Sequence, residues 1–236
     1  MLTATNKDFI NITENFLEGL RRLRVRYNIT LMAEDEEAYN YFSRRSNSEF
    51  HVVSSNQFIL PGKLNRNISS YQHLIRRRTV YILTLLRSGR DVLLVDVDAV
   101  WLKDPLALIF PDYQKFDAWI AQGKEPGFPC PCFFYMKSVT RMINMVYDWI
   151  ARVSYFEDGR PVTDQVALFN ILEKNRRGVH IKYLDYERFP IGKQYFNWTW
   201  HKENHNSVYV AHGNHLGREQ GKIETFKEFG VWLLDI

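Results

Sequence analysis

Apolar residues recur at three- and four-residue steps in several segments of the 236-residue chain, which is the spacing of one helix face. Residues 7–24 show this spacing with five apolar side chains, Phe9, Ile12, Phe16, Leu20 and Leu23. The acidic run at 34–37 predicts the start of a second helix, because carboxylates suit the positive end of the helix dipole. Three more helices are expected: one capped by Ser69 or Ser70 and running through Leu86, one over 139–153 and one over 163–175.

Short apolar runs between these helices predict strands, over 25–33, 50–55, 91–97, 116–122, 131–138, 179–189 and 207–213. The stretch "DVLLVDV" at 91–97 is too apolar to be half exposed, so we place it in the middle of a sheet covered on both faces. Strand and helix patterns alternate through the first half of the chain. The sequence therefore predicts one α/β domain over residues 1–236, with a Rossmann-like, mainly parallel central sheet flanked by helices.

Composition and charge narrow the class of partner. The chain is 45% hydrophobic and 25% charged, which is ordinary for a globular domain with a substantial core. The net charge of +4 comes from short basic clusters at 21–24 and 76–78. This favours a pocket for an anionic small molecule over a nucleic-acid groove, which interleaves more cations with exposed aromatics. We therefore expect no nucleic-acid partner. Since no run of about 20 apolar residues occurs, we also expect no membrane segment in this chain.

Two further features bear on the compartment. Asn-x-Ser/Thr sequons, which indicate a secretory lumen, occur at Asn11, Asn28, Asn67 and Asn197. Asn28 falls inside an expected strand, which favours a chance occurrence there. The chain's two cysteines, Cys130 and Cys132, are separated by one proline, and disulfide geometry disfavours so short a loop. We therefore expect two buried free thiols.

Two carboxylates, Asp96 and Asp98, follow the most apolar run of the chain. In open α/β sheets the ligand lies beyond the carboxyl ends of the strands, and side chains two apart in an extended segment point the same way. Hard anionic oxygens suit Mg²⁺ or Mn²⁺, and such a metal usually accompanies a phosphate. For an isolated Asp-x-Asp, the more common reading is that one aspartate caps a turn and the other is solvated.

The stretch "VLLVDVDAV" also fits the first motif of haloacid-dehalogenase-type phosphatases, with Asp96 as nucleophile and Asp98 as general acid. That family carries the motif near its N-terminus and needs a later acidic pair to hold magnesium. No such pair follows here. The phosphatase is therefore the enzymatic alternative rather than the favoured reading.

Four longer stretches occur in a fixed order: "LLRSGRDVLLVDVDAVWLKDP", "CFFYMKSVTRMINMVYDW", "TDQVALFNIL" and "VAHGNHLGREQGKIETFKEFGVWLLD". Together they resemble the retaining nucleotide-diphospho-sugar transferases typified by plant cell-wall xylosyl- and arabinosyltransferases. The resemblance covers about residues 69–235. It implies a GT-A-type fold, a Mn²⁺ or Mg²⁺ cofactor, a nucleotide-sugar donor such as a UDP-sugar, and a carbohydrate or glycoconjugate acceptor.

The resemblance also implies a role for individual residues. The metal ligands would be Asp96, Asp98 and His212, with His215 as the competitor for the histidine position. The nucleotide-sugar would be bound by Arg78, Asp96, Asp117, Gln122, Asn214, Gly217 and Lys222. The arginine triplet at 76–78 is equally typical of a solvated helix face, from which we expect only one or two side chains to point inward.

Asp164 and Gln165 are the expected catalytic pair, placed beside the anomeric carbon, where one stabilises positive charge on the sugar or positions the acceptor. The plainer interpretation gives Asp164 to helix capping. Because a front-face route needs no protein nucleophile, none is assigned. Trp198 or Trp200 could stack on the acceptor sugar, although a buried aromatic cluster is as well supported.

Some features depart from the family pattern. Many relatives show Asn-Ser/Thr-Gly where this chain has Cys130-Pro131-Cys132, which puts donor contacts through that loop in doubt. The resemblance implies a Golgi or secretory location, with cytoplasmic placement left open, since the anchor and stem of Golgi members are not seen in this sequence. A non-catalytic sugar- or nucleotide-binding module is a further alternative, against which the intact Asp96, Asp98, Asp164 and His212 argue.

Overall fold

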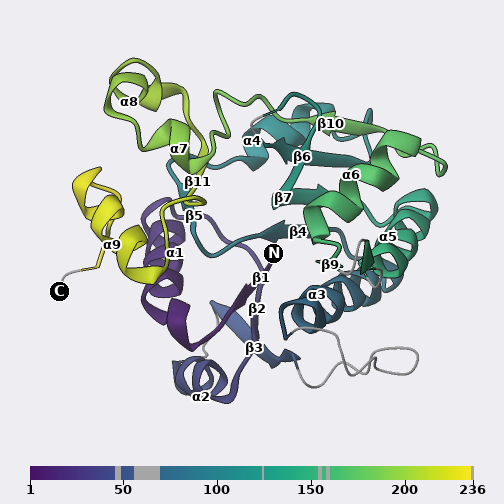
Figure 1. The fold of residues 1–236 in the computed structure, drawn as a ribbon, viewed down its shortest axis with the longest axis horizontal. Coiled ribbons are helices and arrows are strands. Elements are labelled where there is room, and N and C mark those ends of the chain that lie inside the picture. Colours follow the sequence, from purple (N-terminus) through teal and green to yellow (C-terminus); the bar gives the residue numbers. More distant parts are fainter. Residues whose placement is uncertain (46–48, 56–69, 124, 154–155, 158–159, 235–236) are drawn as a thin grey trace.

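The computed structural model describes residues 1–45, 49–55, 70–123, 125–153, 156–157 and 160–234. The sequon at Asn67 and the candidate cap Ser69 lie outside these ranges. Within them, the central feature is a seven-stranded sheet with the order β10-β6-β7-β4-β1-β2-β3 (Figure 1). Its strands are β1 (Leu2–Thr5), β2 (Ile29–Ala33), β3 (Phe50–Ser54), β4 (Val92–Val95), β6 (Ala118–Gln122), β7 (Pro129–Met136) and β10 (Ile181–Tyr183).

The sheet is mainly parallel, which confirms the prediction. Strand β1 pairs in parallel with β2 and β4, β2 pairs in parallel with β3, and β6 with β10. Only β7 among these strands runs antiparallel, and it does so against both β4 and β6. The carboxyl ends of β1, β2 and β4 therefore meet at one edge, where a ligand of an open α/β sheet lies.

Helices cover both faces of this sheet, in agreement with the apolar character of β4. One face packs against α1 (Ile10–Arg22), α2 (Glu36–Arg45) and α4 (Leu106–Ile109), and the other against α3 (Ser70–Arg87), α5 (Thr140–Arg152) and α6 (Asp164–Lys174) (Figure 1). Within β4, Leu93 and Val95 face the first layer, whereas Val92 and Leu94 face the second. Alternate residues of a strand point to opposite faces, so a strand buried on both sides must be apolar throughout.

A third layer packs beside α1 and carries the C-terminal part of the chain. A two-stranded antiparallel sheet joins β5 (Ala99–Trp101) to β11 (Val210–His212), and its pairing sets His212 opposite Ala99. The helices of this layer are α7 (Gly192–Tyr195), α8 (Trp198–Asn204) and α9 (Glu219–Glu228). Through this pairing, the last strand of the chain is brought to the end of β4.

The remaining elements are short: the 3₁₀ helices η1 (Lys7–Phe9), η3 (Phe110–Asp112) and η4 (His205–Ser207), and the hairpin of β8 (Phe156–Glu157) and β9 (Arg160–Pro161). The sequence patterns missed β1, β5 and the three C-terminal helices. Strands β1 and β5 and helices α7 and α8 are too short to show a clear period, and α9 buries only Lys222, Ile223 and Phe226, so it has no continuous apolar face. Of the helices that the structure describes, none combines the length and the hydropathy needed to span a bilayer.

Candidate active site

A cleft of about 470 Å³ opens at the carboxyl ends of β1, β2 and β4 and is closed on one side by the first turn of α6. Its walls bring together segments that are far apart in the sequence, from Thr5 at the end of β1 to Asn214 after β11. Seven of the predicted site residues line it: Arg78, Asp96, Asp98, Asp164, Gln165, His212 and Asn214. This cleft is the candidate active site.

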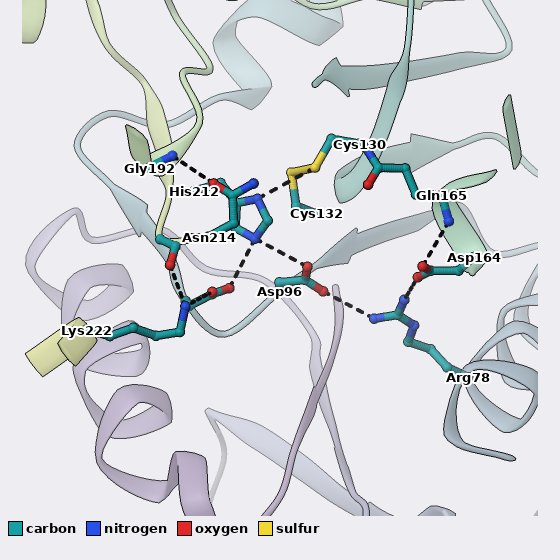
Figure 2. Close-up of polar contacts among 12 residues, drawn as sticks. Arg78, Asp96, Cys130, Cys132, Asp164, Gln165, Gly192, His212, Asn214 and Lys222 are labelled. Carbon is teal, nitrogen blue, oxygen red and sulfur yellow. Dashed lines mark hydrogen bonds and ion pairs between the residues drawn. A yellow bond between two sulfur atoms is a disulfide. The ribbon is translucent and has the colours of Figure 1, made fainter. Parts of the chain in front are cut away.

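Asp96, Asp98 and His212 form the centre of the cleft (Figure 2). Asp96 follows β4 directly, Asp98 precedes β5, and His212 ends β11. The Nε2 atom of His212 lies 3.6 Å from Oδ2 of Asp96 and 3.3 Å from Oδ1 of Asp98. The potential ligand atoms of the three residues all lie within 4.8 Å of one another. The structure thus brings the three predicted metal ligands together.

Two cations turn these carboxylates toward His212. Nη1 of Arg78 lies 3.1 Å from Oδ1 of Asp96, and Nζ of Lys222 donates a 2.9 Å hydrogen bond to Oδ2 of Asp98. The opposite oxygen of each carboxylate is the one that faces His212. Two hard oxygens and one imidazole nitrogen are a donor set that fits Mn²⁺ or Mg²⁺. Arg78 and Lys222 were predicted to bind diphosphate, and here their cationic ends lie on these two aspartates.

The electrostatics of the centre follow from burial and from these ion pairs. Burial raises the pKa of Asp96, and the attraction of Arg78 and His212 offsets this only in part. Burial also acts to raise the pKa of Asp98, but His212 and Lys222 outweigh it, so that pKa lies below its usual range. Burial lowers the pKa of His212, and the nearby Asp98 and Asp96 carboxylates raise it by more. Burial thus disfavours charge on Asp96, whereas mutual attraction favours the charged forms of Asp98 and His212.

Asp164 and Gln165 form the wall opposite His212. Helix α6 begins with Thr163 as its N-cap, whose side chain accepts a hydrogen bond from the backbone N–H of Val166. Thr163 therefore caps the helix. The side chain of Asp164 instead pairs with Arg78: one of its oxygens lies 2.6 Å from Nη2. The other oxygen of Asp164 accepts a hydrogen bond from the backbone N–H of Gln165. Arg78 therefore joins the two halves of the site.

The loop after β11 contributes two further groups. Asn214 lines the cleft, and its Oδ1 accepts a 2.8 Å hydrogen bond from the backbone N–H of Gly192. His215 also lines the cleft, in a left-handed backbone conformation, but it is exposed and does not join the metal-binding set. The structure therefore favours His212 over His215 as the third ligand. Gly217 lies further along the loop with a φ of +85°, outside the residues that line the cleft.

Asp117 and Gln122, which were predicted to contact the nucleotide-sugar, do not line the cleft. Asp117 precedes β6, at the end of the sheet opposite the cleft, where it is buried and paired through both oxygens with Arg141. Gln122, at the other end of β6, donates to the carbonyl of Leu184 and accepts from the backbone N–H of Gly127. Both side chains are thus engaged in holding loops and strands together.

The two candidate acceptor tryptophans lie on α8, outside the residues that line the cleft. Trp198 is 48% exposed, stacks on Phe229 at a ring distance of 4.3 Å, and donates to Glu228. Trp200 is partly buried in the apolar cluster of the C-terminal layer. An acceptor role for either residue stays a prediction.

The expectation of two free thiols was wrong, because Cys130 and Cys132 form a disulfide. Both residues lie on β7, where side chains two apart point the same way, and their Cα atoms are 5.2 Å apart, within the range that a disulfide spans. The strand is irregular here: its register against β6 shifts between Ile120 and Ala121. The disulfide lines the cleft beside His212 (Figure 2).

Glu34 is a cleft residue that the sequence reasoning missed. It follows β2 directly, and burial raises its pKa to about 7. The position of Glu34 just beyond the apolar run "ITLMA" was the signal that could have found it, by the same rule that identified Asp96.

The fold and the site together define a class. A mainly parallel, doubly covered sheet with a carboxylate and imidazole centre at the strand ends is the arrangement of the GT-A glycosyltransferases. A galactosyltransferase solved in complex with donor and acceptor sugar analogues superposes with a TM-score of 0.58, at 11% identity, over 100% of this chain and 96% of its own. At that identity the likeness establishes the fold, which confirms the predicted fold class.

The family follows from the sequence comparison. The model of the family described as nucleotide-diphospho-sugar transferase matches residues 24–226, so the chain belongs to this family, as the sequence motifs predicted. UDP-D-xylose:L-fucose alpha-1,3-D-xylosyltransferase 3 of Arabidopsis thaliana is 23% identical over 100% of this chain and 66% of its own length. UDP-galactose:fucoside alpha-3-galactosyltransferase of Dictyostelium discoideum is 22% identical over 98% of this chain and 42% of its own length. The chain thus spans between two fifths and two thirds of the length of these relatives.

Proposed function

We propose that this chain is a metal-dependent, retaining glycosyltransferase that moves a sugar from a UDP-sugar to a hydroxyl group of a glycan. The observation that carries the proposal is the convergence of Asp96 Oδ2, Asp98 Oδ1 and His212 Nε2 at the end of β4. Transfer from a nucleoside diphosphate builds negative charge on the departing diphosphate, so a cation held at this point lowers the barrier.

Mn²⁺ or Mg²⁺, when bound by Asp96, Asp98 and His212, would act as the Lewis acid that neutralises the diphosphate. The residues around these ligands would position the donor. Asn214 is fixed against Gly192 at the cleft wall, and Lys222 holds Asp98 in place. Outer groups of this kind set the orientation of metal ligands and are nearly as sensitive to substitution as the ligands themselves.

The catalytic pair is proposed to be Asp164 and Gln165. Arg78 neutralises the Asp164 carboxylate, which makes Asp164 better suited to positioning than to nucleophilic attack. Gln165 lines the cleft at the first turn of α6, where its side chain can face the sugar. Retention fits the relatives, because the names of both specify an α linkage and the common UDP-sugar donors are α-anomers.

The relatives also guide the choice of substrates. Their names give different donors, UDP-D-xylose and UDP-galactose, but both give fucose or a fucoside as the acceptor. We therefore propose a UDP-sugar donor and a fucose-bearing acceptor for this chain.

A secretory location is proposed from two observations. The sequon residues Asn11, Asn28 and Asn197 are all exposed, and Asn28 precedes β2 instead of lying within it as expected. The disulfide between Cys130 and Cys132 is of a kind that persists in oxidising compartments. Treatment of the protein from a eukaryotic secretory host with a deglycosylating enzyme tests this, since a loss of mass is expected only if sequons are used.

Calorimetric titration of UDP, with and without Mn²⁺, tests the proposal. Wild-type protein is expected to bind UDP tightly only with the metal. The Asp98→Asn variant is expected to lose this metal-dependent binding. Asp112→Asn is the matched control, because Asp112 is also paired with lysines but lies outside the cleft. Metal-independent UDP binding by the wild type would overturn the proposed mechanism.

A panel of sugar nucleotides separates the remaining alternatives. Slow hydrolysis of one donor is expected of a transferase and not of a binding module, and it would name the donor sugar. Covalent trapping of Asp96 by a phosphate analogue would instead support the phosphatase.

A further inference from the structure

The segment Cys130-Pro131-Cys132 contacts two of the three proposed metal ligands. Sγ of Cys130 lies 3.6 Å from Nδ1 of His212, and the backbone carbonyl of Cys132 accepts a 3.0 Å hydrogen bond from the backbone N–H of Asp96 (Figure 2). A chemical change at the two cysteines therefore alters the direct contacts of Asp96 and His212.

His212 stands between two different sets of potential ligands. Its Nε2 faces the carboxylates of Asp96 and Asp98, whereas its Nδ1 faces Cys130. The first set consists of hard oxygens, and the second of sulfur atoms, which bind softer cations. The ligand atoms of Cys130, Cys132 and His212 also lie within 4.8 Å of one another.

The distance between Cys130 and His212 in the second set suits a tetrahedral metal. Zinc bonds of about 2.3 Å to sulfur and about 2.0–2.1 Å to nitrogen, at a tetrahedral angle, separate the two ligand atoms by about 3.6 Å. The distance between Cys130 Sγ and His212 Nδ1 is 3.6 Å. Cys130 and Cys132 are 4% exposed and His212 is largely buried, so all three side chains lie mostly out of solvent.

We infer that reduction of the Cys130–Cys132 disulfide creates a second metal site, in which both thiolates and Nδ1 of His212 bind a thiophilic divalent cation such as Zn²⁺. The reduction takes two electrons and two protons. A dithiol supplies both and is itself oxidised to a disulfide, whereas a phosphine supplies the electrons and becomes a phosphine oxide, with the oxygen and both protons coming from water. The S–S bond breaks and two thiols form. The cation then displaces their protons, and the fourth position opens to the cleft.

Occupancy of this soft site excludes the hard cation from His212. A neutral imidazole has one nitrogen with a free lone pair, while the other carries the hydrogen. A cation on Nδ1 therefore leaves the hydrogen on Nε2, where it points at the carboxylates in place of a metal. This competition rests on the proposed function, whereas the soft site itself stands on the geometry of three residues.

Cobalt absorption tests the soft site directly, since Co²⁺ replaces Zn²⁺ and gives a thiolate-to-metal band in the near ultraviolet. These two cysteines are the only ones in the chain, so a thiolate band can come from no other position. Protein reduced with a phosphine is expected to bind one Co²⁺ with this band, and oxidised protein is expected to show none. The comparison needs no substitution, and circular dichroism of both forms checks that each is folded.

Variants identify the ligands. Cys130→Ser with Cys132→Ser is expected to abolish the band, and His212→Gln to weaken Co²⁺ binding at least tenfold. His215→Gln is the matched control, because His215 lines the same cleft outside the set, and its Co²⁺ affinity is expected to be unchanged. A reduced wild type without the band, or a weakening by His215→Gln in place of His212→Gln, would overturn the inference.

The competition has a separate measurement. One equivalent of Zn²⁺, added with Mn²⁺ in large excess, is expected to lower Mn²⁺-dependent UDP binding at least tenfold in the reduced protein. In the oxidised protein the effect is expected to be smaller, because there Zn²⁺ competes only for the carboxylate and imidazole site. If the cobalt band forms but UDP binding needs no metal, the soft site is supported and the proposed function fails. If UDP binding needs Mn²⁺ but no cobalt band forms, the proposed function is supported and the soft site fails.

Discussion

Nη2 of Arg78 lies 2.6 Å from Oδ2 of Asp164, and this contact ties α3 to the first turn of α6 across the cleft. The side chains of both residues are only 10% exposed. The same guanidinium also contacts Asp96, so the orientation of a proposed metal ligand and that of a catalytic candidate depend on one arginine. Arg78 is therefore the central positioning residue of the site.

Replacement of Arg78 by alanine is expected to lower the free energy of unfolding by about 3 kcal/mol, because it removes the guanidinium that pairs with the carboxylates of both Asp96 and Asp164. Denaturant unfolding measures the change. Arg177→Ala is the control: the pair of Arg177 with Asp148 is 44% and 35% exposed, so its loss is expected to cost less than about 1 kcal/mol. Equal losses in the two variants would contradict the structural role of Arg78.

Thr163→Ala is expected to destabilise the protein by about 1 kcal/mol, because the cap of α6 loses its hydrogen bond to the N–H of Val166. The first turn of α6 carries Asp164 and Gln165, so turnover is expected to fall as well. Thermal unfolding and donor hydrolysis measure the two effects. Thr163→Ser keeps the hydroxyl and is expected to restore both; a serine variant as impaired as the alanine variant would argue against capping.

Glu34 predicts a pH dependence of stability. Burial raises its pKa from 4.5 to about 7, so the folded protein binds this proton more tightly than the unfolded chain. The contribution of Glu34 to stability is therefore fully present below pH 4.5 and is lost as the pH rises through about 7.

Glu34→Gln removes the free-energy cost of burying a charged carboxylate. At pH 8 the variant is therefore expected to exceed the wild type in unfolding free energy by up to about 3 kcal/mol. The difference is expected to shrink as the pH falls toward 4.5, the usual value of this carboxyl group. Denaturant unfolding across the pH range measures it. A difference that does not change with pH would show that Glu34 does not titrate as described.

Gly213→Ala is expected to displace β11 and with it His212. A Cβ atom at this position would lie 2.8 Å from the backbone oxygen of Asp98 and from a ring carbon of Phe226. Backbone cannot move aside as a flexible side chain does, so we expect a loss of about 1–3 kcal/mol in stability and at least tenfold in Mn²⁺ affinity.

Calorimetry and denaturant unfolding measure both effects of Gly213→Ala. Gly19→Ala is the control, since a Cβ atom at Gly19, inside α1, would meet only Leu233 at 3.6 Å. Alanine is favoured over glycine inside a helix by roughly 0.5–1 kcal/mol, so this variant is expected to be at least as stable as the wild type. Unchanged Mn²⁺ affinity in Gly213→Ala would show that His212 is not positioned through this close contact.

Much of the fold was predictable because it depends on local periodicity. The helix expected over 163–175 is α6 (Asp164–Lys174), and the strand expected over 91–97 contains β4 (Val92–Val95) at the centre of the sheet. Strand β1 (Leu2–Thr5) was missed because it has only four residues and one large apolar side chain, Leu2, which is too short a stretch to establish a period.

The site was predictable where a rule of the fold applies to a single strand end. Asp96 follows an apolar strand and was found, and Glu34 does the same but was missed. Contacts between distant segments were beyond the sequence: that Arg78 contacts Asp164 and that Lys222 contacts Asp98. Tertiary packing brings these residues together, and no spacing along the chain encodes it. The disulfide is a local contact between neighbours on β7, and it was missed because so short a loop was judged unfavourable.

By itself, the sequence determined the family, the mainly parallel sheet and the residue types at the ends of its strands, because apolar periodicity and ordered motifs are local properties of the chain. The tertiary structure decided which of those residues meet. The pairing of β11 with β5 sets His212 beside Asp98, while Asp117 is held at the opposite end of the sheet by Arg141. A site is a set of distances between distant segments, and only the packed chain fixes those distances.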